Sequence, residues 1–168
     1  MLLIDYGDML LEMNQFSLFL NMLFEKYEIE ASPSLLRFEF YSIGPKGKIK
    51  KQIEFKEFPE SPTVYNIGFG DVDTEGNIND LTITGNSDSQ KVLATVALAV
   101  WRFLEKYPAC YVYATGSTKG RSRLYKMGIA NNLDELSENF IVFGLFNNTW
   151  EMFEKEKNYE EFLVKRKT

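Results

Sequence analysis

The feature that most constrains the fold of this chain is a change of hydrophobic period near residue 85. After residue 85, apolar residues recur at helical spacing from Val92 to Leu104. Before it, four consecutive segments read as strands with short links, which predicts an antiparallel meander: Leu36–Ile43, Lys48–Phe58, Val64–Gly70 and Ile78–Thr84. A run of strands followed by a long helix indicates a sheet that the helix covers.

Turn and cap residues mark the boundaries of these elements. Gly44–Gly47 (Gly-Pro-Lys-Gly) is a strong hairpin signal between the first two strands. Ser87 and Gln90 have the spacing of a capping box, which predicts Ser87 as the N-cap of the long helix. Pro108 should end that helix near Tyr107.

The remaining segments complete one domain. At the N-terminus we expect a short strand at Leu2–Tyr6 and a largely buried helix at Asp8–Tyr27. The expected C-terminal elements are a strand and helix within Tyr111–Ile129, a helix at Leu133–Glu138, a strand at Phe140–Phe146, an edge strand or turn at Thr149–Phe153 and a helical turn at Tyr159–Lys165. The prediction is a single α/β (α+β) domain over residues 1–168, with a mostly antiparallel mixed sheet flanked by helices. Residues 27–168 are its core and residues 1–26 an N-terminal helical addition.

Composition excludes several kinds of chemistry. The 168 residues include no histidine and one cysteine, so Ser-His-Asp and Cys-His catalysis, imidazole zinc sites and thiolate clusters are excluded, and we expect no metal. The net charge of −5 means that nucleic acid or another anion must be bound by a local basic patch.

The sequence also indicates where the protein works. Phe16–Phe24 is apolar but too short to span a bilayer, and the acids Asp5, Asp8 and Glu12 occupy the place where a signal peptide needs positive charge. A lone cysteine suits a reducing compartment. We therefore expect a cytoplasmic protein that makes no membrane contact.

The best functional signal is the strand–turn–helix at Tyr111–Ile129. Lys119 and Arg121 lie in the expected first turn of the helix, where their charge opposes the helix dipole. Backbone N–H groups of the preceding glycine turn converge at the same place, so the segment predicts a site for a phosphate or carboxylate. The expected ligand-binding residues are Thr115, Gly116, Ser117, Thr118, Lys119, Arg121 and Arg123.

Helical spacing distributes the side chains of this segment over three faces. The faces comprise Lys119, Arg123 and Lys126; Gly120, Leu124 and Met127; and Arg121 with Tyr125. The alternative interpretation is a solvated basic face on an acidic protein, with Tyr125 as partly buried packing.

Two other segments resemble ion sites. Asp71–Asn79 begins like a calcium loop, but Thr82 stands where the closing glutamate belongs, which favours a hairpin turn with acidic flanks. Gly85–Gln90 opens the long helix and could receive an anion, but Asp88 would repel phosphate. We expect an ordinary helix cap there.

Cysteine and the aromatic residues have structural interpretations. Cys110 has no adjacent base to activate it and is expected to be a structural thiol. Seven aromatic residues largely alternate along the strands, which favours a core over a stacking platform for bases: Phe38, Phe40, Tyr41, Phe55, Phe69, Tyr111 and Tyr113.

The runs Phe38–Ile49 and Lys91–Thr95, together with Ala114–Tyr125, resemble an uncharacterised bacterial family of unknown function, found mainly in Bacteroidetes. The resemblance covers residues from about Tyr27 to the C-terminus. It implies no activity, and the residues before Tyr27 are expected to be an addition to its pattern.

The order of elements and the run Arg123–Ile129 are similar to the GCN5-related N-acetyltransferase superfamily and its last-helix motif. This resemblance implies Tyr125 as general acid, Asp71 or Asp73 as a base through water, and Arg121 with Arg123 as phosphate anchors. It also implies that Leu81–Thr84 and Tyr111–Thr115 splay to admit a pantetheine arm. Acetyl-CoA is the cofactor implied, although Gly85–Gln90 lacks the superfamily's glycine-rich pyrophosphate turn.

Three functional hypotheses follow. The first is a domain that binds a phosphate-bearing ligand in the manner of an acyltransferase, up to a divergent N-acyltransferase. The second is a non-catalytic module for a nucleotide or nucleic acid, as in a bacterial toxin–antitoxin or anti-phage defence system. The third is an interaction module whose apolar N-terminal helix docks a protein partner or a second copy.

Overall fold

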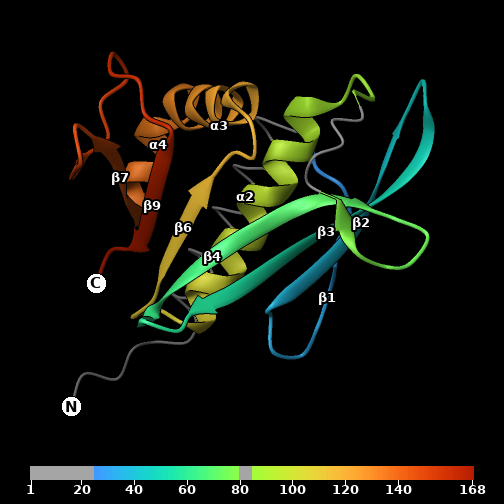
Figure 1. Ribbon diagram of the computed structural model, residues 1–168, viewed down its shortest axis with the longest axis horizontal. Helices are drawn as coiled ribbons and strands as arrows, with labels where there is room; N and C mark the ends of the chain where they lie inside the picture. Colours follow the sequence, from blue (N-terminus) through green and yellow to red (C-terminus); the bar gives the residue numbers. More distant parts are fainter. Residues whose placement is uncertain (1–24, 80–84) are drawn as a thin grey trace.

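The computed structural model describes residues 25–79 and 85–168, which form one open, mixed β-sheet packed against helices (Figure 1). The described helices are α2 (Ser89–Lys106), α3 (Lys119–Asn131) and α4 (Leu133–Asn139). The described strands are β1 (Glu30–Ala31), β2 (Arg37–Gly44), β3 (Gly47–Phe58), β4 (Ser61–Val72), β5 (Ile78–Asn79), β6 (Tyr111–Thr115), β7 (Phe140–Phe146), β8 (Thr149–Met152) and β9 (Glu161–Arg166). The predicted single α+β domain with a mostly antiparallel mixed sheet is confirmed.

The strands follow the order β1-β2-β3-β4-β6-β9-β7-β8, and β5 pairs with β4 beside this path. All pairs are antiparallel except that of β4 with β6. The predicted meander is confirmed for β2, β3 and β4, and β5 pairs antiparallel with β4.

Several expectations fall outside the described residues. They are the strand at Leu2–Tyr6, residues 8–24 of the expected N-terminal helix, and residues 80–84 of the fourth expected strand. Residues 25–27 of that helix are described, and they are not helical.

The hairpin between β2 and β3 depends on two glycines. Gly44 pairs with Gly47, and Gly47 has a φ of +89°, a conformation that other residues adopt only with strain. A Cβ atom on Gly44 would lie 2.0 Å from the carbonyl oxygen of Asn86. The tip of the hairpin therefore fits closely against the loop before α2.

The long helix α2 provides the centre of the core. Its Phe103 and Leu104 are completely buried, and the Phe103 ring stacks on Phe55 of β3 with 4.3 Å between centroids. Phe38 and Phe40 of β2 belong to the same cluster, as the alternation of the strands predicts. Packing against β2 and β3 fixes one side of α2 and leaves its other side facing α3 and the second half of the sheet.

The C-terminal segment corrects one expectation. The helical turn predicted at Tyr159–Lys165 is wrong, because Glu161–Arg166 is β9, which lies between β6 and β7. Phe162 is 1% exposed and faces the core, while its neighbours Glu161 and Leu163 are only partly buried. This period of two suits a strand, and without β9 both β6 and β7 would present unpaired edges.

Edge strand β8 is joined to the following loop by a small charged cluster. The Glu151 carboxylate accepts hydrogen bonds from the Lys157 ammonium at 2.7 Å and the Tyr159 hydroxyl at 2.8 Å. The hydrogen bond from Lys157, and then that from Tyr159, lowers the pKa of Glu151 below its ordinary value of 4.5. The same cluster raises the pKa of Lys157.

We expect this cluster to stabilise the fold near neutral pH and to lose its effect in acid. Because the pKa of Glu151 is lower in the folded chain than in the unfolded chain, its contribution is complete above about pH 4.5 and disappears as the pH falls through the folded pKa. The difference in Tm between the wild type and Glu151→Gln should therefore be positive at pH 7 and shrink below pH 4.5. A difference that does not vary with pH would contradict this assignment.

Candidate ligand-binding site between two helices

A cavity of about 250 Å³ lies between α2, α3 and the sheet. Its α2 wall consists of Gln90, Leu93, Ala94, Val96, Ala97 and Val100. Its floor includes Ile67 of β4, Val112 of β6, Val142 of β7 and Phe162 of β9. Apolar side chains predominate throughout the described lining, and the few polar ones are Gln90, Tyr125, Asn131 and Asn132.

The sheet opens at one end of this cavity. Strands β4 and β6 pair in parallel, with Val64–Asn66 beside Tyr111–Tyr113. Ile67 and Phe69 of β4 and Ala114 of β6, which follow the paired residues, line the cavity. The expected splay of Leu81–Thr84 from Tyr111–Thr115 stays a prediction, because Leu81–Thr84 lies outside the described residues. The described neighbours of β6 are β4 and β9.

The turn before α3 is held by its own hydrogen bonds. The Gly116 N–H donates to the Ser122 hydroxyl at 3.0 Å, and that hydroxyl donates to the Glu160 carbonyl at 3.2 Å. The Thr115 hydroxyl donates to the same carbonyl at 3.0 Å. The Thr118 hydroxyl caps α3 by accepting from the Arg121 N–H at 3.2 Å. Gly116 and Thr118 therefore have structural partners within the turn.

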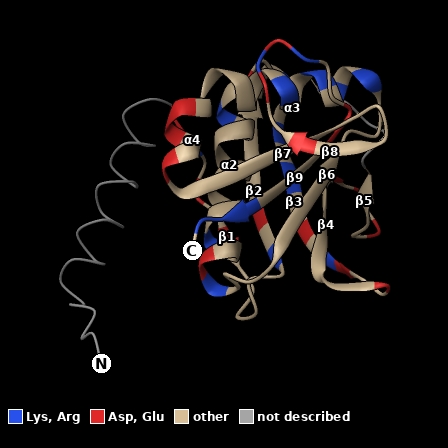
Figure 2. Cartoon of the chain, turned by 90° about the vertical axis from the view of Figure 1, so that its left-hand side faces the viewer, with Lys and Arg blue, Asp and Glu red and all other residues tan. Residues whose placement is uncertain are grey.

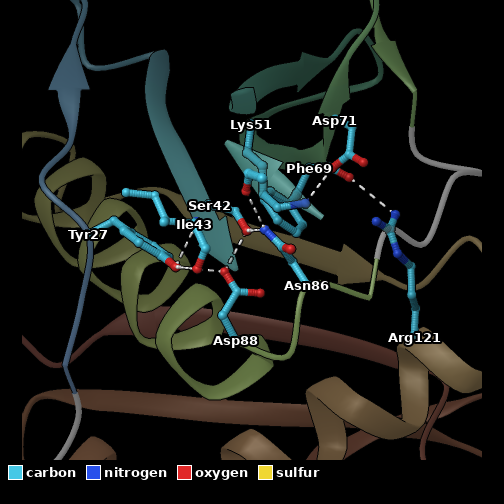
Figure 3. A network of polar contacts seen from close by, with 10 residues as sticks. Tyr27, Ser42, Ile43, Lys51, Phe69, Asp71, Asn86, Asp88 and Arg121 are labelled. Atoms are coloured by element: carbon cyan, nitrogen blue, oxygen red, sulfur yellow. Dashed lines mark hydrogen bonds and ion pairs between the residues drawn. The ribbon is translucent and has the colours of Figure 1, made fainter. Parts of the chain in front are cut away.

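The two arginines expected as phosphate anchors lie on different sides of α3. Arg121 points toward β4, where its Nη1 donates to the Phe69 carbonyl at 3.2 Å (Figure 3). The same nitrogen donates to the Ser117 hydroxyl at 3.4 Å, and the guanidinium lies 5.7 Å from the Phe69 ring centre. Arg121 thus bridges α3 to the part of β4 that lies beyond its pairing with β6.

Arg123 lines a second hollow, together with Lys119 and Lys126. This basic hollow also includes Asn158 and Glu160, from the segment before β9. Lys126 donates to the Asn158 side chain at 3.1 Å. Within the described part of the chain, no carboxylate forms an ion pair with these three cations. Figure 2 shows basic residues on α3 and acidic residues on α4.

Met127 joins the two hollows, because it lines the cavity as well as the basic hollow. Met127 is 51% exposed, so only part of its side chain faces the cavity. Leu124, Tyr125, Gly128 and Ile129 of α3 also line the cavity. A Cβ atom on Gly128 would lie 3.5 Å from Leu93 Cδ1, so α3 approaches α2 closely at this glycine.

The two candidate bases have structural partners. Asp71 is 8% exposed and forms a buried ion pair with Lys51 of β3 (Figure 3). Asp73 accepts hydrogen bonds from the Glu75 and Asn77 N–H groups, both at 2.9 Å, and shapes the turn between β4 and β5. The hairpin interpretation of this turn is therefore confirmed. Among the described residues, no group of acidic or cysteine side chains could hold a metal ion.

The start of α2 differs from the predicted capping box. The helix begins at Ser89 with Asp88 as N-cap, and Ser87 has a φ of +58°, so Ser87 is not the cap. Asp88 forms no capping bond, because its carboxylate accepts from the hydroxyls of Tyr27 at 2.7 Å and Ser42 at 2.5 Å. Asn86 completes this network by donating to Ser42 and Gly47 (Figure 3). A carboxylate therefore occupies the place where a pyrophosphate would meet α2.

Sequence reasoning missed this network because its members lie far apart in the sequence. Tyr27 and Asp88 are 61 positions apart, and Ser42 and Asn86 are 44 apart. The cavity was missed for a similar reason: its lining comes from three helices and several strands, and no local motif marks it. The only local signal was the apolar character of α2 on all of its faces.

Cys110 agrees with its structural interpretation. It packs against the main core cluster, and burial raises the pKa of its thiol. A raised thiol pKa leaves less of the reactive thiolate at neutral pH. Of the seven aromatic residues predicted to form a core, Phe38, Phe40 and Phe55 are buried, and Tyr41 is 43% exposed.

Fold and cavity together define an α+β domain with an apolar cavity beside a basic helix. The chain belongs to DUF6934, a family of unknown function whose model matches residues 24–167. No curated protein and no solved structure matches it. None of the helices within residues 25–79 and 85–168 is long and apolar enough to cross a membrane.

Proposed function

We propose that this domain binds a phosphate-bearing small molecule that carries an apolar arm. An acyl thioester of coenzyme A is a molecule of this kind. The arm enters the cavity between α2 and α3, and the phosphates contact Lys119, Arg123 and Lys126. The observation that carries the proposal is the junction of these two hollows at Met127. Apolar pockets with a few convergent polar groups are the usual form of small-molecule sites.

Electrostatics support the position of the phosphates. The chain has a net charge of −5, so a hollow lined by three cations of one helix and by the single carboxylate of Glu160 is a local exception. Among the described residues, no carboxylate forms an ion pair with these cations. Lysine and arginine both bind phosphate oxygens, and arginine can do so with two parallel hydrogen bonds. The alternative position, at the start of α2, contains the Asp88 carboxylate, which would repel an anion.

The proposal does not require catalysis. Tyr125 lines the cavity, as a general acid near a thioester would. The two candidate bases are engaged elsewhere, because Asp71 pairs with Lys51 and Asp73 holds a turn. We therefore propose binding alone, and acyl transfer through Tyr125 stays a prediction.

The other two hypotheses stay predictions as well. A nucleotide or nucleic acid could use the same basic hollow, but its bases would not need the apolar cavity. An interaction module built on the N-terminal helix depends on residues 8–24, which lie outside the described ones.

Isothermal titration with acetyl-CoA tests the proposal. We expect heat of binding at micromolar concentrations, and about tenfold or more weaker binding for Lys119→Ala/Arg123→Ala, because each removes a charge-assisted contact. The matched control is Lys46→Ala/Lys155→Ala, which removes the same net charge from exposed lysines outside both hollows. Affinity should also fall as salt is raised.

Two results would refute the proposal. One is the absence of heat with any coenzyme A derivative at high micromolar concentration. The other is an equal loss of affinity in both double variants, which would mean that net charge and not the hollow attracts the ligand. ATP and a short RNA, titrated in parallel, separate the second hypothesis from the first.

A further inference from the structure

The cavity is long in comparison with a two-carbon acyl group. Its α2 wall runs from Gln90 to Val100, and at 1.5 Å per residue this stretch of helix is about 15 Å long. The opposite wall extends from Leu124 of α3 to Leu136 of α4. Phe140 lies at this side of the cavity and is itself fixed by an edge-on contact with Trp101, with 5.0 Å between centroids.

The cavity volume indicates how much the arm can contain. A water molecule in the liquid takes about 30 Å³, and a methylene group is of similar size, so roughly eight such groups fit into the space. An acetyl group would leave most of it empty, and side chains around an empty space lose their contacts on that side.

The nature of the lining favours a saturated, apolar chain, and the length of the α2 wall suits an extended one. The α2 wall carries only small and aliphatic side chains beyond Gln90, and two of them are the alanines Ala94 and Ala97. The polar side chains of the lining are at Gln90, at Tyr125 and at the end of α3. A saturated chain that lies between these residues has no polar group of its own, so it buries none without a hydrogen-bond partner.

We infer that the apolar arm is a linear, saturated acyl or alkyl chain of medium length, about eight carbons. The inference rests on the proposed function, because it identifies the arm of the ligand whose phosphates bind the basic hollow. The chain lies along the α2 wall, passes Tyr125 and ends toward Leu136 and Phe140.

A series of acyl-CoA thioesters with two, four, six, eight and twelve acyl carbons tests this inference by titration calorimetry. Each methylene that enters an apolar site should strengthen binding about fourfold. We expect this gain to continue to about eight carbons and then to stop, because further carbons remain in water.

A filled cavity should abolish the gain. Ala97→Phe places a large ring in the α2 wall, so the ratio of its affinities for the eight-carbon and two-carbon thioesters should fall to near one, whatever its affinity for acetyl-CoA itself. The matched control is Ala109→Phe, at an exposed position outside the cavity, which should retain the full dependence on chain length. If Ala97→Phe does not fold, Gly128→Ala narrows the same space at ordinary contact distance from Leu93 and should reduce the gain in part.

The possible results separate the two proposals. Equal affinity for all chain lengths would overturn the inference and leave the proposed function intact. Tightest binding by a branched or aromatic acyl group would also overturn it. Absence of binding by every thioester would refute both.

Discussion

Replacing Phe162 by Ala is expected to lower the free energy of unfolding by about 3–5 kcal/mol. Phe162 is 1% exposed and lies on β9, the strand that joins β6 to β7. Its ring contacts Phe153 and Tyr159 with centroid distances of 6.2 and 6.5 Å, and it also forms part of the cavity floor. The loss includes the free energy gained by burying the ring and the cost of the cavity that its removal leaves. The strands on both sides of β9 cannot close over this cavity.

Urea unfolding followed by circular dichroism measures this loss. The matched control is Leu163→Ala, the next residue of the same strand, which lies on the opposite face and is only partly buried. It should cost clearly less than Phe162→Ala. Equal costs at the two positions would contradict the register of β9, and a small cost at both would favour the helical turn that the sequence predicted.

Replacing Asp71 by Ala is expected to cost about 3–5 kcal/mol of stability, because it leaves the Lys51 ammonium buried without its carboxylate. Lys51 is 5% exposed, and apart from Asp71 its nearest described charge-stabilising contact is the Phe69 ring, at 5.8 Å. The double variant Lys51→Met/Asp71→Ala should be more stable than Asp71→Ala, because no charge is left in the interior. The buried charge, and not the loss of a few contacts, is then the main cost.

A double-mutant cycle in urea, completed with Lys51→Met, measures the coupling between the two side chains. The matched control is Asp73→Ala, which removes an exposed carboxylate two residues away and should cost much less. Additive effects at positions 51 and 71 would show that the ion pair does not matter for stability. Because Asp71 was also a candidate base, its variant must be shown to be folded before any loss of activity is assigned to chemistry.

Local signals predicted the first half of the sheet well. The alternation along residues 36–58 and the Gly44–Gly47 turn identified β2, β3 and their hairpin to within a residue or two. The apolar period after residue 90 and Pro108 identified α2, and Phe140–Phe146 was predicted with the bounds that β7 has. At these positions local propensity and tertiary packing favour the same structure.

Prediction failed where a distant partner decides the local structure. The short segment Glu161–Arg166 is a strand because β6 and β7 both need a neighbour, and this need is invisible in the segment itself. Asp88 leaves the helix end uncapped because Tyr27 and Ser42 offer it hydroxyls from other elements. For the candidate site, the basic residues of α3 were found from their spacing, but their division between β4 and the basic hollow required the position of α3 on the sheet.

The position of β9 has a consequence for biosynthesis. Translation delivers β6 and β7 before the strand that connects them, so the half of the sheet that contains β6, β9 and β7 stays incomplete while residues 140–160 leave the ribosome. During that interval the edges of both strands are exposed, and nascent chains that stall there are candidates for pairing with one another. Residues 161–166 therefore complete the sheet only after the other strands have been synthesised. A shortened translation product that lacks them should be a target for chaperones and proteases.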